Sequence, residues 1–153
     1  MKTAISSLEK KHFPVMLDQV IQACLPFKKN HLIIDCTFGG GGYSKKLLSL
    51  SNTRVIALDR DKSAIRRAKN LEKDYPTQFT FYNEKFSNLD RVVEKGNKPD
   101  VIIFDLGLST FQLQDYSRGF SFKSKERIDM QMGLSETSAE DVINTLDEKK
   151  LKL

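Results

Sequence analysis

Short apolar runs alternate along the chain with amphipathic segments, and this alternation predicts its secondary structure. Four apolar runs have the length of strands and cover residues 32–36, 54–58, 79–82 and 100–105. Apolar residues at helical spacing predict helices over residues 15–25, 43–50, 61–71 and 88–94. Strands that alternate with helices form a parallel sheet between helical layers, so the pattern predicts a doubly wound α/β fold.

The pattern changes after the fourth run. Residues 100–105 read Asp-Val-Ile-Ile-Phe-Asp, and such an unbroken apolar run predicts a strand that is buried on both faces. From Gly107 to Gly133 no periodicity is visible, and a long irregular stretch inside a compact domain is more often functional than not. Residues 138–149 predict one more amphipathic helix, with Ser138 as its N-cap and Asp141 in the capping-box position.

A glycine-rich turn follows the first predicted strand. Four consecutive glycines, Gly39 to Gly42, come shortly after Asp35, and the second predicted strand ends in Asp59. An α/β sheet binds a nucleoside cofactor with this succession, because its backbone approaches the ligand closely at the turn and the acid binds ribose hydroxyls. The alternative is that Asp35 caps the turn and the glycines only tighten it.

The residues around the turn discriminate between cofactors. The nicotinamide dinucleotide fingerprint needs glycine or alanine three places after its second glycine. That place holds Ser44 if Gly41 is the second glycine and Lys45 if Gly42 is. Asp35 would repel a pyrophosphate but would favour a cationic ligand. These residues therefore favour S-adenosylmethionine, which has a ribose and a positive amino group but no phosphate. Asp35, Asp59 and Asp105 all fall at strand ends, where ligands of such sheets bind.

Composition narrows the class of protein further. The 153 residues contain 25 Lys and Arg against 20 Asp and Glu, a net charge of +5, which fits an RNA partner but equally a lysine-rich solvated surface. Cys24 and Cys36 lie on apolar stretches without a second pair, so neither a disulfide framework nor a metal site is expected. No apolar run approaches the roughly 20 residues that cross a bilayer. We expect a cytoplasmic protein without a membrane partner.

Seven segments resemble, in order and spacing, the RsmH (MraW) family of bacterial methyltransferases. They are residues 12–16 (HFPVM), 35–44 (DCTFGGGGYS), 57–61 (ALDRD), 105–109 (DLGLS), 112–113 (QL), 118–122 (RGFSF) and 128–130 (IDM). The resemblance extends from His12 to about Leu146. It implies transfer of a methyl group from S-adenosylmethionine to the exocyclic N4 of a cytidine in the decoding region of 16S ribosomal RNA, within the small ribosomal subunit.

The resemblance also implies a cofactor site. It places the cofactor against Gly41, Gly42 and Tyr43, with Asp59 on the ribose, and the pocket is completed by Phe86, Asp105 and Gln112. Asp35 is a further candidate from its place at a strand end. Asp105 is also a candidate catalytic residue, because an acceptor at this strand end would receive a hydrogen bond from the amino group that is methylated.

Arg118 and Phe120 are candidate RNA-binding residues, because unpaired bases stack on aromatic and arginine planes. Phe111 and Tyr116 lie nearby in the sequence. The alternative is that Phe120 and Phe122 anchor the irregular stretch to the core. For Phe122 we favour this anchoring role over RNA binding.

The chain departs from the family pattern in length and at four positions. Tyr43 replaces a histidine, Gln114 an aspartate, Gln131 an arginine and Gly133 an acid. Family members are about twice as long and carry a helical domain inserted after the last matching segment. We therefore expect an incomplete Rossmann-like class I methyltransferase sheet of four parallel strands over residues 1–134, with the fourth strand at its edge, and the beginning of the helical insertion over residues 135–153.

Two other functions stay open from the sequence. The first is an inactive remnant that at most binds cofactor or RNA, and the second, disfavoured by the failed glycine fingerprint, is a nicotinamide-dependent oxidoreductase. The sequence sets neither the cytidine that is modified nor the oligomeric state.

Overall fold

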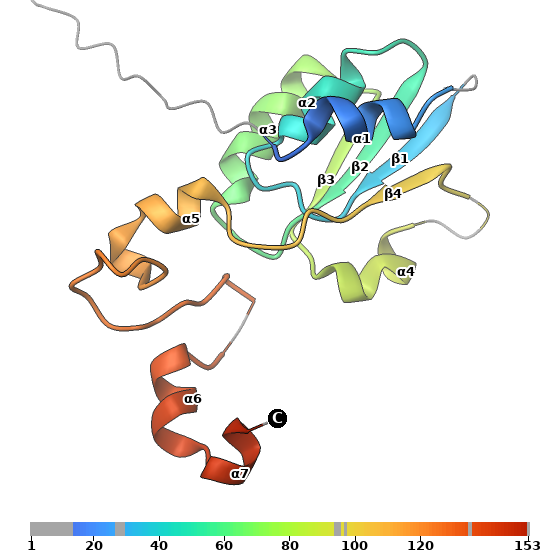
Figure 1. Cartoon of the computed structure of the whole chain (residues 1–153). Helices are drawn as coiled ribbons and strands as arrows, with labels where there is room; N and C mark the ends of the chain where they lie inside the picture. Colours follow the sequence, from blue (N-terminus) through green and yellow to red (C-terminus); the bar gives the residue numbers. More distant parts are fainter. Residues whose placement is uncertain (1–13, 27–29, 94–95, 97, 135, 153) are drawn as a thin grey trace, which may run out of the picture.

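A computed structural model of the chain describes residues 14–26, 30–93, 96, 98–134 and 136–152. Its centre is a parallel sheet with the strand order β3-β2-β1-β4 (Figure 1). The strands are β1 (His31–Asp35), β2 (Thr53–Leu58), β3 (Phe79–Tyr82) and β4 (Val101–Ile103). The predicted α/β fold with four parallel strands is confirmed.

Helices cover the two faces of the sheet unequally. Helices α1 (Leu17–Ala23), α2 (Gly42–Leu48) and α3 (Ala64–Asp74) lie on one face, whereas α4 (Leu89–Val92), preceded by the short turn η1 (Phe86–Asn88), lies on the other (Figure 1). The layer under α1 to α3 is the larger part of the core.

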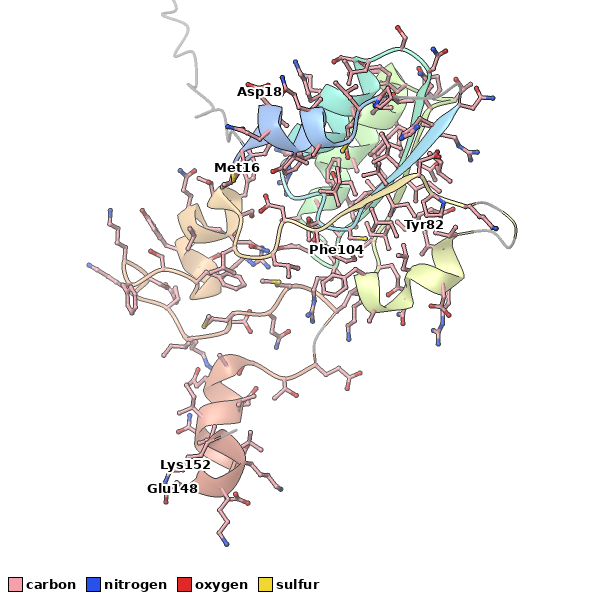
Figure 2. All side chains as sticks on the ribbon, turned by 45° about the vertical axis from the view of Figure 1, so that its right-hand side comes forward. Met16, Asp18, Tyr82, Phe104, Glu148 and Lys152 are labelled. Carbon is pink, nitrogen blue, oxygen red and sulfur yellow. The ribbon has the colours of Figure 1, made fainter. Side chains whose placement is uncertain are left out.

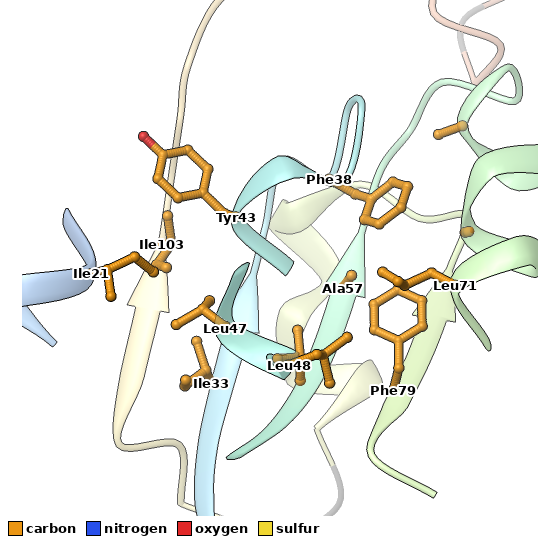
Figure 3. Packing of buried hydrophobic residues seen from close by; sticks show 13 residues of the cluster. Ile21, Ile33, Phe38, Tyr43, Leu47, Leu48, Ala57, Leu71, Phe79 and Ile103 are labelled. Atoms are coloured by element: carbon orange, nitrogen blue, oxygen red, sulfur yellow. The ribbon is translucent and has the colours of Figure 1, made fainter. Parts of the chain in front are cut away.

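Alternation along β1 explains how the sheet is buried from both sides. Ile33 packs with Leu47 and Leu48 of α2 in the larger cluster (Figure 3). Leu32 and Ile34 point to the other face and pack with residues near α4. All five residues of β1 are buried, so this strand is the centre of the fold.

The fourth strand differs from its prediction. Among the described residues β4 pairs with β1 only, through Ile33 and Val101, Ile34 and Ile102, and Asp35 and Ile103. Ile103 is buried, but Ile102 keeps 43% of its surface exposed. The expected burial on both faces is wrong because, in the part of the chain that the structure describes, α4 is the one α-helix on that face, whereas the expected edge position is confirmed.

The region after β4 contains more regular structure than the sequence pattern predicts. It includes helix α5 (Thr110–Gln114) and the short turn η2 (Tyr116–Arg118). The predicted helix over residues 138–149 is instead two helices, α6 (Ala139–Thr145) and α7 (Glu148–Leu151). Leu146 has an extended backbone between them, and the carboxylate of Asp147 starts α7 by accepting from the Lys150 N–H at 3.0 Å.

The predicted N-cap of α6 is confirmed. The Ser138 hydroxyl accepts from the Asp141 N–H at 3.0 Å, and the Asp141 carboxylate accepts from the Ser138 N–H at 3.1 Å. Glu148 of α7 and Lys152, the residue after the helix, form an ion pair far from the sheet (Figure 2). None of the helices in the described part of the chain is long and apolar enough to cross a membrane.

Candidate functional site

A cleft of about 350 Å³ opens at the carboxyl ends of the strands. It lies where β1 has β2 on one side and β4 on the other, which is the position where sheets of this kind bind ligands. Most of the residues predicted to bind the cofactor line it, namely Gly42, Tyr43, Asp59, Phe86, Asp105 and Gln112. Gly41 and Asp35 are not among the residues that line the cleft.

Close packing within the protein explains why glycine stands at two positions of the turn. Gly41 has a left-handed backbone with φ of 76°, and a Cβ there would lie 2.7 Å from the ring of Phe38. A Cβ at Gly42 would lie 2.2 Å from the ring of Pro14. The packing of the protein itself therefore requires glycine at both positions, whether or not a ligand approaches.

Asp35 lies beneath the turn and is fully buried. Its carboxylate accepts from the Ser44 hydroxyl at 2.7 Å and from the Thr37 N–H at 3.2 Å. Burial raises the pKa of this carboxyl to about 6, although both hydrogen bonds act in the opposite direction. This geometry matches the alternative interpretation, in which Asp35 holds the turn.

Asp59 connects the end of β2 to the glycine turn. Its carboxylate accepts from the Gly39 N–H at 2.7 Å and from the Asp61 N–H at 2.8 Å. Burial raises the pKa of Asp59, against the effect of these hydrogen bonds. A carboxylate has about four acceptor positions, so a ligand hydroxyl still finds acceptors on this side chain.

Asp105 and Phe86 form the opposite part of the wall. The Asp105 N–H donates to the Thr37 hydroxyl at 2.7 Å, which fixes the backbone after β4 while the side chain stays exposed. The rings of Phe86 and Phe104 meet edge to face with centroids 5.5 Å apart. Phe86 is 44% exposed and gives the cleft a flat apolar surface.

Tyr43, at the position where the resemblance leads us to expect a histidine, is buried and contacts the N-terminal region. Its hydroxyl donates to the carbonyl of Val15. Burial raises the pKa of Tyr43, and the carboxylates of Asp105 and Asp35 add to the shift. The polar end of this ring is therefore used within the protein.

Gln112 is held on both sides of its amide. The side-chain carbonyl accepts from the Ser109 N–H at 2.8 Å, which completes a capping box at the start of α5. The side-chain NH₂ donates to the Asp61 carboxylate at 2.7 Å. Gln112 lines the cleft, and its amide is already bound to the protein.

The two candidate RNA-binding residues, Arg118 and Phe120, make contacts within the protein. The Arg118 guanidinium donates to the Asp61 carboxylate at 2.8 Å and lies 5.1 Å from the ring of Phe120. Phe120 is buried, so it anchors the segment as the alternative interpretation held. Phe122 is fully exposed, so that interpretation is wrong for Phe122.

Asp61 is a site residue that the sequence did not reveal. Burial raises the pKa of its carboxyl, but hydrogen bonds from Gln112, Ser63 and Arg118 outweigh burial and hold the pKa below its ordinary value. The one local signal is the Asp-x-Ser pattern, in which Asp61 accepts from the Ser63 N–H at 2.9 Å. Its partner Arg118 is 57 residues away, beyond the reach of any local pattern.

Comparison with known proteins gives one consistent family. The profile of the MraW methylase family matches residues 9–153. Ribosomal RNA small subunit methyltransferase H of Rhodospirillum rubrum is 43% identical over 142 residues, which are 92% of this chain and 43% of that protein. The protein of the same name from Orientia tsutsugamushi is 39% identical over 140 residues, 92% of this chain and 45% of that protein. The chain thus spans less than half the length of these relatives.

A crystal structure of a proposed rRNA methylase from Clostridium thermocellum has a similar fold. The TM-score is 0.52 with 20% identity, over 64% of this chain and 54% of that chain.

Proposed function

Because this chain belongs to the MraW methylase family, we propose that its cleft binds S-adenosylmethionine and that the chain forms the cofactor-binding part of an RNA methyltransferase. The observation that carries the proposal is the convergence of residues from distant segments on one cleft at the carboxyl ends of the strands. The cleft volume of about 350 Å³ falls in the range of small-molecule sites.

The chemistry of the wall fits this cofactor. The cleft is lined by the carboxylates of Asp59, Asp61 and Asp105 and by two arginines, Arg60 and Arg67. Asp59 would accept from the ribose hydroxyls, and Phe86 would stack on the adenine ring. The bound cofactor supplies a methyl group on a positively charged sulfur, which is electrophilic without a metal. The exposed carboxylate of Asp105 at the cleft suits that positive charge.

We propose that the methyl acceptor is the exocyclic N4 of a cytidine in 16S ribosomal RNA. The relatives are named ribosomal RNA small subunit methyltransferases, and this chain carries a net charge of +5. The lone pair of a cytosine amino group is delocalised into the ring, so the site must orient the group and accept its hydrogen bonds as charge develops. The exposed carboxylate of Asp105 at the cleft is the acceptor that we assign to this role.

The RNA contact is better supported at Phe122 than at Arg118 or Phe120. Phe122 is fully exposed, and Lys123 and Lys125 beside it are exposed as well. Among the described residues, no carboxylate pairs with either lysine. An exposed aromatic ring next to two unpaired cations fits an unpaired base with its phosphates.

The test is a calorimetric titration of the 153-residue chain with S-adenosylmethionine. We expect saturable binding that falls by about tenfold or more in Asp59→Ala, because hydrogen bonds to a charged group are lost. Asp74→Ala, an exposed acid at the end of α3, is the matched control and should bind as the unchanged chain does. Absence of saturable heat in a folded chain would contradict the proposal.

Two further experiments, a titration and a methyl-transfer assay, test the oxidoreductase and the inactive remnant. Binding of a nicotinamide dinucleotide in place of S-adenosylmethionine would favour the oxidoreductase. Cofactor binding without transfer of a labelled methyl group to small ribosomal subunits would favour the remnant.

A further inference from the structure

One buried carboxylate gathers three distant parts of the chain at the side of the cleft. Asp61 is 4% exposed, and a single oxygen, Oδ2, accepts from the Gln112 amide at 2.7 Å and from Arg118 at 2.8 Å. Its other oxygen, Oδ1, accepts from the Ser63 N–H at 2.9 Å. The end of β2 is thereby connected to α5 and to η2.

Arg118 extends this connection to the far end of the irregular segment. Its second nitrogen, Nη2, donates to the carbonyl of Gln131 at 2.6 Å, and its own carbonyl accepts from the Met130 N–H at 2.9 Å. The residue after Gln131, Met132, lines the cleft. One guanidinium therefore holds the two sides of the segment, before and after its exposed loop.

Apolar burial secures α5 only weakly. Phe111 and Leu113, on this five-residue helix, keep 37% and 41% of their surface exposed, and its buried residue is the polar Gln112. Arg67 also lies over Phe111, with its guanidinium carbon 4.3 Å from the ring centroid. The place of α5 beside the cleft thus depends on polar contacts.

We propose that Asp61 and Arg118 form a clasp that positions the cleft wall made by Ser109, Gln112 and Met132, and so sets the affinity for the cofactor. The inference rests on the proposed function of the cleft. In this clasp, Arg118 is a positioning residue that acts through Asp61 and Gln131. Removal of one partner from a buried ion pair leaves the other charge without compensation, so the segment is expected to move away from Asp61.

A close backbone contact makes the clasp specific to one arrangement. Gly119 has φ of 73°, and a Cβ there would lie 2.6 Å from the carbonyl oxygen of Arg127 and 2.9 Å from the Asp129 nitrogen. The chain after Arg118 therefore packs directly on residues 127–129. Because the two sides of the segment stay packed on each other, loss of the guanidinium contacts is expected to release both sides from Asp61 together.

A double-mutant cycle tests the clasp. The dissociation constant of S-adenosylmethionine is measured by calorimetry for Arg118→Ala, Asp61→Asn and the double variant. We expect each single change to weaken binding by about tenfold, and the double change to weaken it no more than either one. Because Asp61 itself lines the cleft, a direct contact with the cofactor would instead make the two losses additive.

Two control variants separate positioning from general stability. Arg127→Ala breaks the exposed pair of Arg127 with Glu140 in the same region and should leave the affinity unchanged. Leu71→Ala removes a buried side chain of α3 and should lower the free energy of unfolding without changing the affinity of the folded protein. An unchanged dissociation constant in Arg118→Ala, or an equal loss in Leu71→Ala, would overturn the clasp.

Limited trypsin digestion gives a readout that does not require the cofactor. Cleavage at Lys123 and Lys125 should be faster in Arg118→Ala than in the unchanged chain, and not faster in Arg127→Ala. The cofactor should slow this cleavage in the unchanged chain. If the cofactor does not bind at all, the proposed function fails, and the digestion still shows whether the clasp holds the segment; equal rates in all variants would overturn it.

Discussion

Asp35 illustrates how the same residue type serves two purposes at one strand end. Its carboxyl is fully buried under the glycine turn, whereas Asp59 and Asp105 line the cleft. The sequence placed all three at the ends of strands, because an acid after an apolar run is a local feature. Asp35 does not line the cleft, because its carboxylate is buried and accepts a hydrogen bond from the Ser44 hydroxyl. Which of these acids faces a ligand is thus decided by packing in three dimensions.

The raised pKa of Asp35 predicts a pH-dependent stability. Burial raises the pKa from 3.8 to about 6, so between these values the folded chain binds more protons than the unfolded chain. Stability therefore falls as pH rises through this window, by up to about 3 kcal/mol from this group. The penalty is absent below the unfolded pKa and complete above the folded one.

The measurement is urea unfolding at about pH 4.5 and about pH 7 for the unchanged chain and Asp35→Asn. The stability of Asp35→Asn relative to the unchanged chain should increase with pH. Since every other acid is common to both proteins, the difference isolates Asp35. An identical pH dependence in the two proteins would show that the carboxyl titrates normally.

At the scale of elements, local patterns predict what local forces determine. The strands, the glycine turn and the capping box of Ser138 and Asp141 are all visible in the sequence, since each depends on residues a few positions apart. Helix α5 has the same kind of signal, because Ser109 and Gln112 form a Ser-x-x-Gln capping box, but the irregular pattern around it hid the helix.

Other features of these elements have no local signal. The apolar run 100–105 would suit a central strand as well as an edge strand, so the exposure of Ile102 depends on which elements lie beside it. The pairing of Arg118 with Asp61 joins positions 57 residues apart. Arg118 and Phe120 were assigned to RNA because their residue types suit stacking, and residue type alone does not distinguish a buried ring from an exposed one.

The loop around Phe122 gives a prediction for RNA binding. Phe122→Ala should weaken the binding of a single-stranded RNA fragment by about fivefold or more, because stacking of one base on an aromatic ring contributes about 1–3 kcal/mol. Phe122→Tyr, which keeps the ring, is the matched control. Fluorescence anisotropy of labelled RNA measures the effect, and the affinity for S-adenosylmethionine should not change in either variant.

The lysines of this loop should act differently from its aromatic ring. Lys123→Ala and Lys125→Ala are expected to lessen the salt dependence of RNA binding, because each removes one phosphate contact. If Phe122→Ala bound RNA as the unchanged chain does, the exposed ring would have to serve a different contact.

At the scale of the whole molecule, β4 has no strand on its outer side in the part of the chain that the structure describes, so the sheet has an open apolar edge there. Figure 2 shows Phe104 where β4 ends, away from α1 and α2, and it is 49% exposed. Ile102 of β4 is 43% exposed, and Leu106 and Leu108, which follow the strand and line the cleft, are 70% and 42% exposed. An exposed apolar edge strand is a template for another strand. We therefore expect this edge to associate with a polypeptide strand.

Self-association of the purified chain tests this expectation. Sedimentation velocity over a range of concentrations should show association that is reduced by Ile102→Lys, because a charge at the edge opposes strand pairing. Ile143→Lys is the matched control, since Ile143 is 58% exposed on α6, away from the sheet. If Ile143→Lys removed the association and Ile102→Lys did not, the contact would lie on α6.

Because Phe104 contacts Phe86 in the cleft wall, pairing along β4 should also order that wall. The associated form should therefore bind S-adenosylmethionine more tightly than the Ile102→Lys monomer.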